Sequence, residues 1–185
     1  RHSLIKVQPH IMINFTESWD DAEFPSAYLI TIRTYGTWLH GDKRTSVDKR
    51  HGRNKFRSPK IPPSENLEAA MEANAKHPPI LLDKNRRIAV DLSIRETCQI
   101  QDYRLDALNV RTNHLHAVVG AKFKPELIIR RFKSYATRKL GLSGLILKNQ
   151  RVWSRGGSRR YLWKENHVNR AIDYVLYGQG KLDFE

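Results

Sequence analysis

The sequence predicts an α+β fold in which helices pack on one face of an antiparallel sheet. Segments of alternating apolar and polar residues are separated by segments with apolar residues at helical spacing. They follow each other as strand, helix, strand, strand, helix and strand, with one more helix at the end. This order is typical of a ferredoxin-like sheet. The 185 residues, of which 39% are hydrophobic and 28% charged, are enough for one ordinary hydrophobic core.

The first strand is expected from Ala27 to Thr34, where large apolar residues occupy every second position. Residues 1–24 before it are interpreted as an N-terminal extension, so that a single domain spans residues 25–185. Residues from about 40 to 80 are polar and basic and contain five prolines. They are interpreted as an insertion that leaves the sheet, with one short helix from about Ser64 to Lys76.

The middle of the chain predicts a helix followed by two strands. Asp83 is a suitable cap for a helix that continues to about Gln101, because this stretch has no glycine or proline. Strands are expected at Tyr103 to Val110 and at His114 to Gly120, joined by a tight connection.

The last third predicts two more helices and a hairpin. Pro125 suits the first turn of a helix that ends near Gly141. A hairpin that turns at Gly156 and Gly157 is expected to pair residues 151–153 with residues 159–163. A final helix from Glu165 to Tyr177 ends before Gly178 and is expected to pack near the open face of the sheet.

The strand at His114 carries two imidazoles on one face. Side chains alternate along a strand, so His114 and His116 point away from the core, and Leu115 and Ala117 point into it. Two imidazoles side by side can chelate one metal ion. The alternative is that they are ordinary surface histidines on a half-buried sheet.

Composition favours a nucleic-acid partner. The formal charge is +14 and the pI is about 10.1, and such a chain is attracted to polyanions. No apolar run approaches the length of a membrane-spanning helix, so no membrane partner is expected.

Cys98 is the single cysteine, which excludes an internal disulfide and a cysteine-rich zinc site. With no apolar signal segment at the start of the sequence, we expect a cytoplasmic protein.

Thirteen Lys and Arg residues lie between Lys122 and Lys164, opposed only by Glu126. Aromatic residues lie among these cations, so phosphates and stacked bases could both be bound there. The alternative is that the rings belong to the core and the charges only solvate a surface. The residues expected to bind DNA are Arg130, Arg131, Lys133, Arg138, Lys139, Arg151, Arg155, Arg159 and Arg160.

Two tyrosines on helices differ in their expected environment. Tyr135 falls inside the apolar stripe of its helix and is predicted to be core, whereas Tyr174 lies off the stripe of the final helix. A phenol presented near a metal and a basic surface is a candidate nucleophile for a phosphodiester. Tyr174 is therefore the predicted catalytic residue.

Three motifs together resemble those of single-tyrosine HUH transposases, in particular the REP-associated tyrosine transposases. They are Thr112-Asn113-His114-Leu115-His116, the basic helix from Phe132 to Arg138, and Ala171 to Val175 followed by Gly178-Gln179-Gly180. The resemblance implies that His114 and His116 bind a divalent ion such as Mg2+ or Mn2+. It also implies that Tyr174 attacks single-stranded or hairpin DNA, which leaves a 5′-phosphotyrosine and a free 3′-hydroxyl. A homodimer is a further possible arrangement.

The sequence departs from the family at the third metal ligand. The family commonly places a Gln or Asn one helical turn after the tyrosine, and that position here is Gly178, with Gln179 one residue later. Gln179 can be the ligand only if the helix ends at Gly178 and the chain brings the side chain back. Two other functions stay open: a non-catalytic nucleic-acid-binding module on a ferredoxin-like sheet, and a metal-dependent nuclease that uses water.

Overall fold

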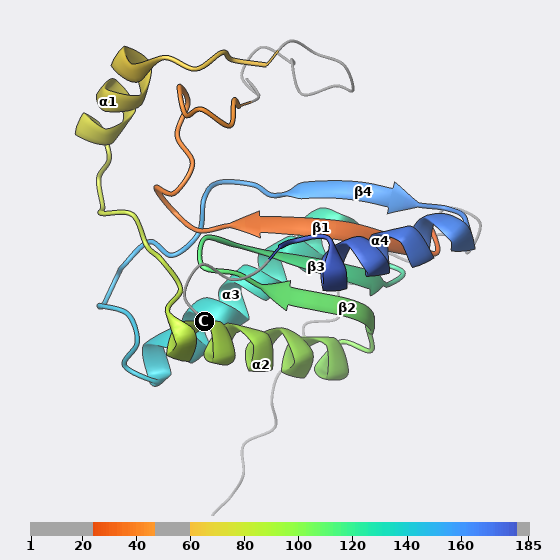
Figure 1. The fold of residues 1–185 in the computed structure, drawn as a ribbon. Helices are drawn as coiled ribbons and strands as arrows, with labels where there is room; N and C mark the ends of the chain where they lie inside the picture. The colour runs from red at the N-terminus through yellow and green to blue at the C-terminus, as the bar shows by residue number, and fades with distance from the viewer. Residues whose placement is uncertain (1–23, 47–59, 181–185) are drawn as a thin grey trace, which may run out of the picture.

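The structure is a computed structural model that describes residues 24–46 and 60–180. The predicted N-terminal extension therefore lies outside the described residues except for residue 24, and so do residues 47–59 of the predicted insertion. The described part contains four strands and four helices (Figure 1). Their bounds in chain order are β1 (Ala27–Arg33), α1 (Glu65–Ala73), α2 (Lys84–Ile100), β2 (Arg104–Val110), β3 (His114–Gly120), α3 (Pro125–Leu142), β4 (Ser158–Leu162) and α4 (Glu165–Tyr177).

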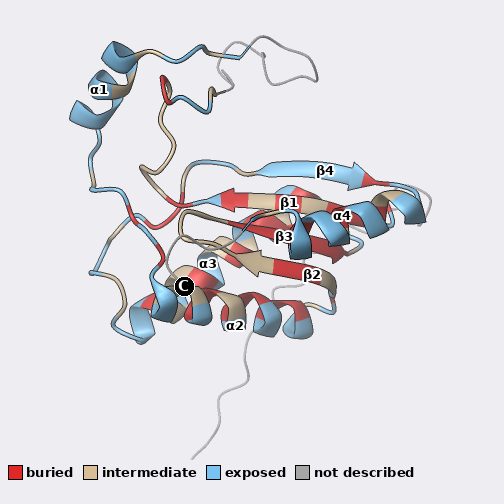
Figure 2. Cartoon of the chain, in the orientation of Figure 1, coloured by how far each residue is buried: buried red, intermediate tan, exposed pale blue. Residues whose placement is uncertain are grey.

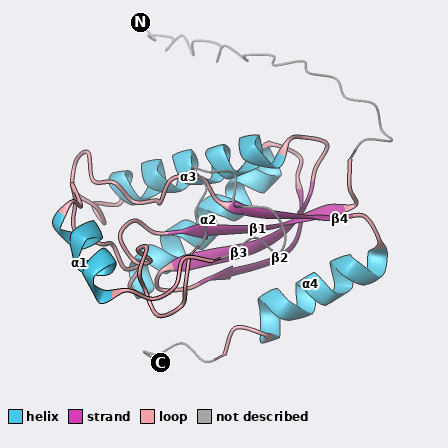
Figure 3. Cartoon of the chain, turned by 90° about the horizontal axis from the view of Figure 1, so that it is seen from above, coloured by secondary structure: helices cyan, strands magenta, loops and turns pink. Residues whose placement is uncertain are grey.

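The four strands form one antiparallel sheet in the order β2-β3-β1-β4. Helices α2 and α3 cover one face of this sheet and contact each other, while α4 lies against the other face (Figure 3). Leaving α1 aside, the chain runs β-α-β-β-α-β and then adds α4. The predicted α+β, ferredoxin-like fold with a C-terminal tyrosine-bearing helix is confirmed.

Local sequence signals define the helix ends. The Ser64 hydroxyl accepts a hydrogen bond from the Leu67 backbone N–H at 3.3 Å and caps α1. The Asp83 carboxylate accepts one from the Arg86 N–H at 2.9 Å and caps α2, as predicted. Pro125 occupies the first position of α3, where the missing N–H has no partner to lose.

The buried apolar residues form two clusters, one on each face of the sheet. Figure 2 shows buried positions along the strands of the sheet and on α2. The larger lies between the sheet and helices α2 and α3, and includes Ile30, Leu115 and Phe132. The smaller lies under α4, where Val118 packs with Val175. The sheet is therefore covered on both faces, and α4 closes the face that carries the histidines.

The prediction that Tyr135 is core is wrong, because its side chain is 37% exposed. The buried line of α3 runs through Ile128, Phe132, Ala136 and Leu140, each four residues from the next. Tyr135 lies at the margin of this line, and its ring remains at the surface.

The predicted hairpin between residues 151–153 and 159–163 is also wrong. Both segments lie along the same edge of β1 and pair with it one after the other. Trp153 forms a bridge with Thr34, and β4 pairs with residues 27–31. The Ser154 N–H donates to the Arg33 carbonyl at 3.0 Å, so the two glycines lie in an irregular link along one long edge. The extended chain continues from β1 to Thr34, so β1 and the residue after it can pair with the two segments in turn, which removes the need for a turn between them.

The described part of the insertion extends away from the sheet. Helix α1 has no buried residue and stands apart from the sheet (Figure 1). Its start is tied to the preceding loop, where the Ser64 N–H donates to the Gly41 carbonyl at 2.8 Å. Across residues 24–46 and 60–180, the helices lack the combination of length and apolarity that crossing a membrane requires.

Candidate active site

The two histidines of β3 lie in cross-strand rows on the α4 face of the sheet. His116 is flanked by Thr31 on β1 and Asn109 on β2, its Cα partners. His114 is flanked by Arg33 on β1, and its carbonyl accepts from the Arg111 N–H at 2.8 Å just after β2. Directly opposite residues point to the same face of a sheet. The rows therefore surround both imidazoles with polar and cationic side chains.

Both imidazoles are held through the same ring nitrogen. His116 Nδ1 lies 2.8 Å from the Thr31 hydroxyl oxygen, and His114 Nδ1 lies 2.6 Å from Asn113 Oδ1. A proton on Nδ1 satisfies both contacts and leaves the lone pair on Nε2. Such a partner on the second nitrogen is the usual way in which a protein fixes the orientation of a metal-binding histidine. The two rings lie close together, with centroids 4.7 Å apart.

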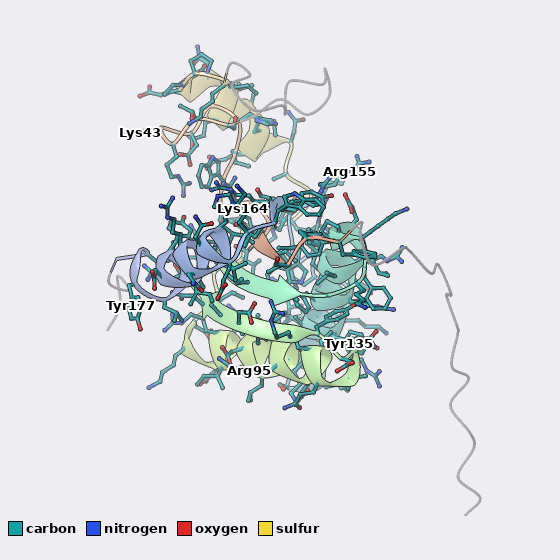
Figure 4. All side chains as sticks on the ribbon, turned by 90° about the vertical axis from the view of Figure 1, so that its right-hand side faces the viewer. Lys43, Arg95, Tyr135, Arg155, Lys164 and Tyr177 are labelled. Atoms are coloured by element: carbon teal, nitrogen blue, oxygen red, sulfur yellow. The ribbon has the colours of Figure 1, made fainter. Side chains whose placement is uncertain are left out.

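Tyr174 lies next to this pair. Its ring centroid is 5.5 Å from that of His116, and its side chain is 44% exposed, so the phenol contacts both the histidine and solvent. Helix α4 is held there by buried Val175, whose carbonyl accepts from Asn109 Nδ2 at 2.8 Å. Tyr177 is also exposed and projects outward from α4, on the far side of the sheet from Tyr135 on α3 (Figure 4). The predicted position of Tyr174 outside the core is confirmed.

The chain brings Gln179 back toward the site after α4 ends. Gly178 is the C-cap of α4, and a Cβ atom there would lie 2.8 Å from the Tyr174 carbonyl oxygen, so the close passage requires glycine. Gln179 Nε2 lies 3.3 Å from that same carbonyl. Burial lowers the pKa of His114 and of His116, and the interaction of each imidazole with the Gln179 side chain opposes that lowering. The condition under which Gln179 can act as third ligand is met, although its role remains a prediction.

Burial keeps both imidazoles neutral. His116 is only 7% exposed, and burial together with the charge of His114 lowers its pKa from 6.5 to about 4, against the raising effect of Gln179. Burial also lowers the pKa of His114, again opposed by Gln179. Arg33 and Arg111 lower the pKa of both rings further. At neutral pH both imidazoles are therefore in the uncharged form that binds a metal.

Sequence reasoning missed the arginines around the histidines. The Arg33 guanidinium lies over the Trp38 ring at 3.4 Å, and Arg44 lies over the same ring at 4.4 Å. Arg44 Nε donates to Asp42 Oδ1 at 2.8 Å, and this bond helps to lower the pKa of Asp42 to about 2. The only early signal was that Arg33 occupies an outward position of the first strand. The result is a positive surrounding for a bound anion.

The donor set fits a divalent cation with open coordination positions. Among the described residues, no three His, Cys, Asp or Glu side chains gather as a metal site. Two imidazoles and one amide oxygen, from His114, His116 and Gln179, would supply three neutral ligands and leave further positions for phosphate oxygens. A neutral donor set leaves the full charge of the cation available to an anionic substrate.

The residues predicted to bind DNA are not gathered around the histidines. Several of them contact other protein groups: Arg131 donates to the Tyr103 hydroxyl, Lys133 donates to the Ser154 carbonyl at 2.7 Å, Lys139 pairs with Glu96 at 2.9 Å, Arg159 pairs with Glu126 at 2.7 Å, and Arg151 lies over the Tyr35 ring at 4.7 Å. Arg130 and Arg138 line a groove on the outer side of α3. Arg155 lies in the exposed link before β4, and Arg160 on β4 faces the same side as Leu29, its partner on β1.

Comparisons with known proteins find similarity among solved structures. A search with protein-family models finds no match, and a search of curated proteins finds none either. Among solved structures, the chain is similar to a REP-associated tyrosine transposase bound to a REP hairpin. The two share 11% sequence identity and a TM-score of 0.47, over 89% of this chain and 70% of the other.

Proposed function

We propose that this protein is a metal-dependent enzyme that cleaves and rejoins single-stranded DNA, with Tyr174 as the nucleophile, as in HUH transposases. The observation that supports the proposal is that side chains from β3, from α4 and from the segment after α4 lie next to each other. The Tyr174 ring from α4 lies 5.5 Å from that of His116 on β3, and Gln179 from the segment after α4 interacts with both imidazoles. A phenol, two neutral imidazoles and an amide in one cationic surrounding suit attack on a phosphodiester.

The reaction exchanges one phosphoester for another. The Tyr174 hydroxyl oxygen forms a bond to phosphorus while the bond between phosphorus and the 3′-oxygen breaks. The phenol loses its proton and the departing 3′-oxygen gains one, so the net change is a 5′-phosphotyrosine and a free 3′-hydroxyl. A 3′-hydroxyl can reverse the step on the same or another strand. The energy of the phosphoester is retained in the covalent link, and no nucleotide cofactor is needed.

The surrounding residues have separate tasks in this proposal. His114, His116 and Gln179 would hold the cation, with Thr31 and Asn113 fixing the two rings. The cation, Mg2+ or Mn2+, supplies Lewis-acid stabilisation of charge on the non-bridging phosphate oxygens when bound. Imidazole ligands favour Mn2+ over Mg2+ for such a site. Arg33 and Arg111 flank His114 and would attract the phosphate.

A covalent adduct tests the proposal. Labelled single-stranded DNA is incubated with the protein and Mn2+, and the products are separated under denaturing conditions. Wild-type protein should give a protein-DNA adduct, and Tyr174→Phe should give none, although it keeps the ring and its contact with His116. Tyr177→Phe and Tyr135→Phe are the matched controls and should form the adduct normally.

Three outcomes contradict the proposal. DNA found on Tyr135 or Tyr177 after digestion of the adduct would assign a different nucleophile. Cleavage without an adduct, undiminished in Tyr174→Phe, would indicate a nuclease that uses water. Binding without cleavage under any divalent ion would indicate a nucleic-acid-binding module.

A further inference from the structure

The edge strand β4 and the residue after it present an exposed aromatic pair on the α3 side of the sheet. Tyr161 and Trp163 are 45% and 54% exposed, and their rings are stacked nearly parallel, with centroids 6.4 Å apart and planes inclined by 13°. The Tyr161 ring is fixed by an edge contact with buried Tyr28, centroid to centroid 5.3 Å. Two large parallel rings that are exposed to solvent lack the stabilisation that burial gives to aromatic residues in the core. Their outer faces are available for a flat ligand.

A basic groove adjoins this pair. It is an open groove of about 690 Å³ between α3 and the link at Gly156, and its cationic lining residues are Arg130, Lys133 and Arg138. Lys133 donates to the carbonyls of Ser154 and Gly156, which holds the link against α3. Glu126 is the acidic residue of the lining, and it pairs with Arg159, two residues before Tyr161. The groove and the aromatic pair therefore meet at this ion pair, and together we term them the β4–α3 surface.

The β4–α3 surface lies on the opposite side of the sheet from the histidines. Arg159 and Tyr161 are opposite Ile30 and Tyr28, which belong to the core beneath α2 and α3. Thr31, the partner of His116, points to the α4 face instead. A ligand on the β4–α3 surface leaves the histidines and Tyr174 accessible.

We infer that the β4–α3 surface is a second binding site for single-stranded DNA, separate from the candidate active site. Unpaired bases stack on Tyr161 and Trp163, and the phosphates of the adjoining nucleotides contact Arg130 and Arg138 in the groove. Cations beside exposed stacked rings match a ligand that is both anionic and flat. Bases in a duplex are stacked on each other and do not offer their faces, which favours an unpaired strand. The inference rests on the proposed function only in taking DNA as the substrate.

Equilibrium binding without metal tests this site independently of catalysis. A fluorescently labelled oligo(dT) of about 12 nucleotides is titrated with the full chain in the presence of a chelator, so that no cleavage occurs. Tyr161→Ala and Trp163→Ala should each weaken binding roughly 5- to 100-fold, the range expected for loss of one stacked base. Tyr161→Phe and Trp163→Phe keep a ring and should retain most of the affinity. Tyr135→Ala removes an exposed ring on α3 outside the groove and should have no effect.

An abasic strand separates stacking from a structural role. A strand with the same phosphates but without bases should bind the wild type more weakly, and the Tyr161→Ala and Trp163→Ala variants should no longer distinguish the two strands. Equal effects of these substitutions on both strands would overturn the inference, and so would unchanged affinity, preference for duplex, or tighter binding of the matched RNA. A wild type that binds in this way but forms no adduct would refute the proposed function and leave this inference standing.

Discussion

On the α4 face of the sheet, buried His116 and half-buried His114 lie among arginines, whereas on the α2/α3 face arginines lie at the surface beside stacked rings. The first arrangement holds groups that must be uncharged to act as ligands, and burial lowers their pKa. The second leaves Arg130 and Arg138 in an open groove, where phosphates can reach them. The most basic stretch of the sequence therefore does not coincide with the candidate active site. Our two proposals therefore place chemistry and strand binding on opposite faces of the sheet.

The largest effect is expected from the histidines themselves. His114→Ala or His116→Ala should reduce metal-dependent adduct formation at least about 1,000-fold, because several kcal/mol of charge stabilisation in the transition state are lost. Affinity for oligo(dT) without metal should stay near that of the wild type, because the β4–α3 surface is unchanged. Circular dichroism of each variant checks the fold. Unchanged cleavage in either variant would remove the metal site from the α4 face.

The next effect is a dependence of stability on pH that originates on the α4 face. The pKa of His116 is 6.5 in the unfolded chain and about 4 in the native state, so between these values the unfolded chain binds the extra proton. The contribution of neutral His116 to the free energy of unfolding is complete above pH 6.5. This contribution decreases by about 3 kcal/mol in total as the pH falls toward 4. Urea unfolding of the metal-free protein at several pH values measures this slope. The slope should be reduced in His116→Leu, and an equal slope in that variant would assign the loss to other groups.

The alternation of apolar residues in strands and their helical spacing in helices predicted the fold correctly. The two predictions about the fold that were wrong have physical causes. Alternation located β1 and β3, because one face of each strand packs on a core. Tyr135 was predicted wrongly because it lies at the margin of the apolar stripe of α3. At such a margin, helical spacing alone does not distinguish a buried side chain from an exposed one. The glycines at 156 and 157 indicated a turn, but a turn signal does not say which strand the flanking segments pair with. Here one segment pairs with β1 and the other with Thr34 just after it.

The candidate site could be predicted only where local rules suffice. The shared face of His114 and His116 follows from alternation along one strand, and the exposure of Tyr174 follows from its place on one helix. Arg33 was missed because its position beside His114 depends on the register between β1 and β3, which lie far apart in sequence. The return of Gln179 depends on the course of the chain after Gly178, for which periodicity gives no rule.

A smaller effect is expected at the third ligand. Gln179→Ala should lower metal affinity by about 10-fold if the amide is a ligand, since the two imidazoles remain. The adduct should recover at high Mn2+ concentration, which distinguishes weak binding from a damaged site. Gln179→Asn shortens the side chain by one methylene and should give an intermediate affinity. Isothermal titration with Mn2+ measures all three proteins, and an unchanged affinity in Gln179→Ala would leave water or another residue as the third ligand.

The smallest effect is expected in the salt dependence of binding, and it tests how the cations of the α2/α3 face divide their tasks. Each phosphate contact on a single strand contributes about 0.7 to the slope of log affinity against log salt, so six contacts would give a slope of about −4. Arg130→Gln and Arg138→Gln should each make the slope less steep by about 0.7, because both residues line the groove. Lys139→Gln is the matched control, since Lys139 pairs with Glu96 at 2.9 Å and does not line the groove. Its slope should stay close to that of the wild type. Equal changes of the slope in all three variants would mean that single-stranded DNA responds to the net charge of the protein alone. The groove on the α2/α3 face would then have no specific part in binding.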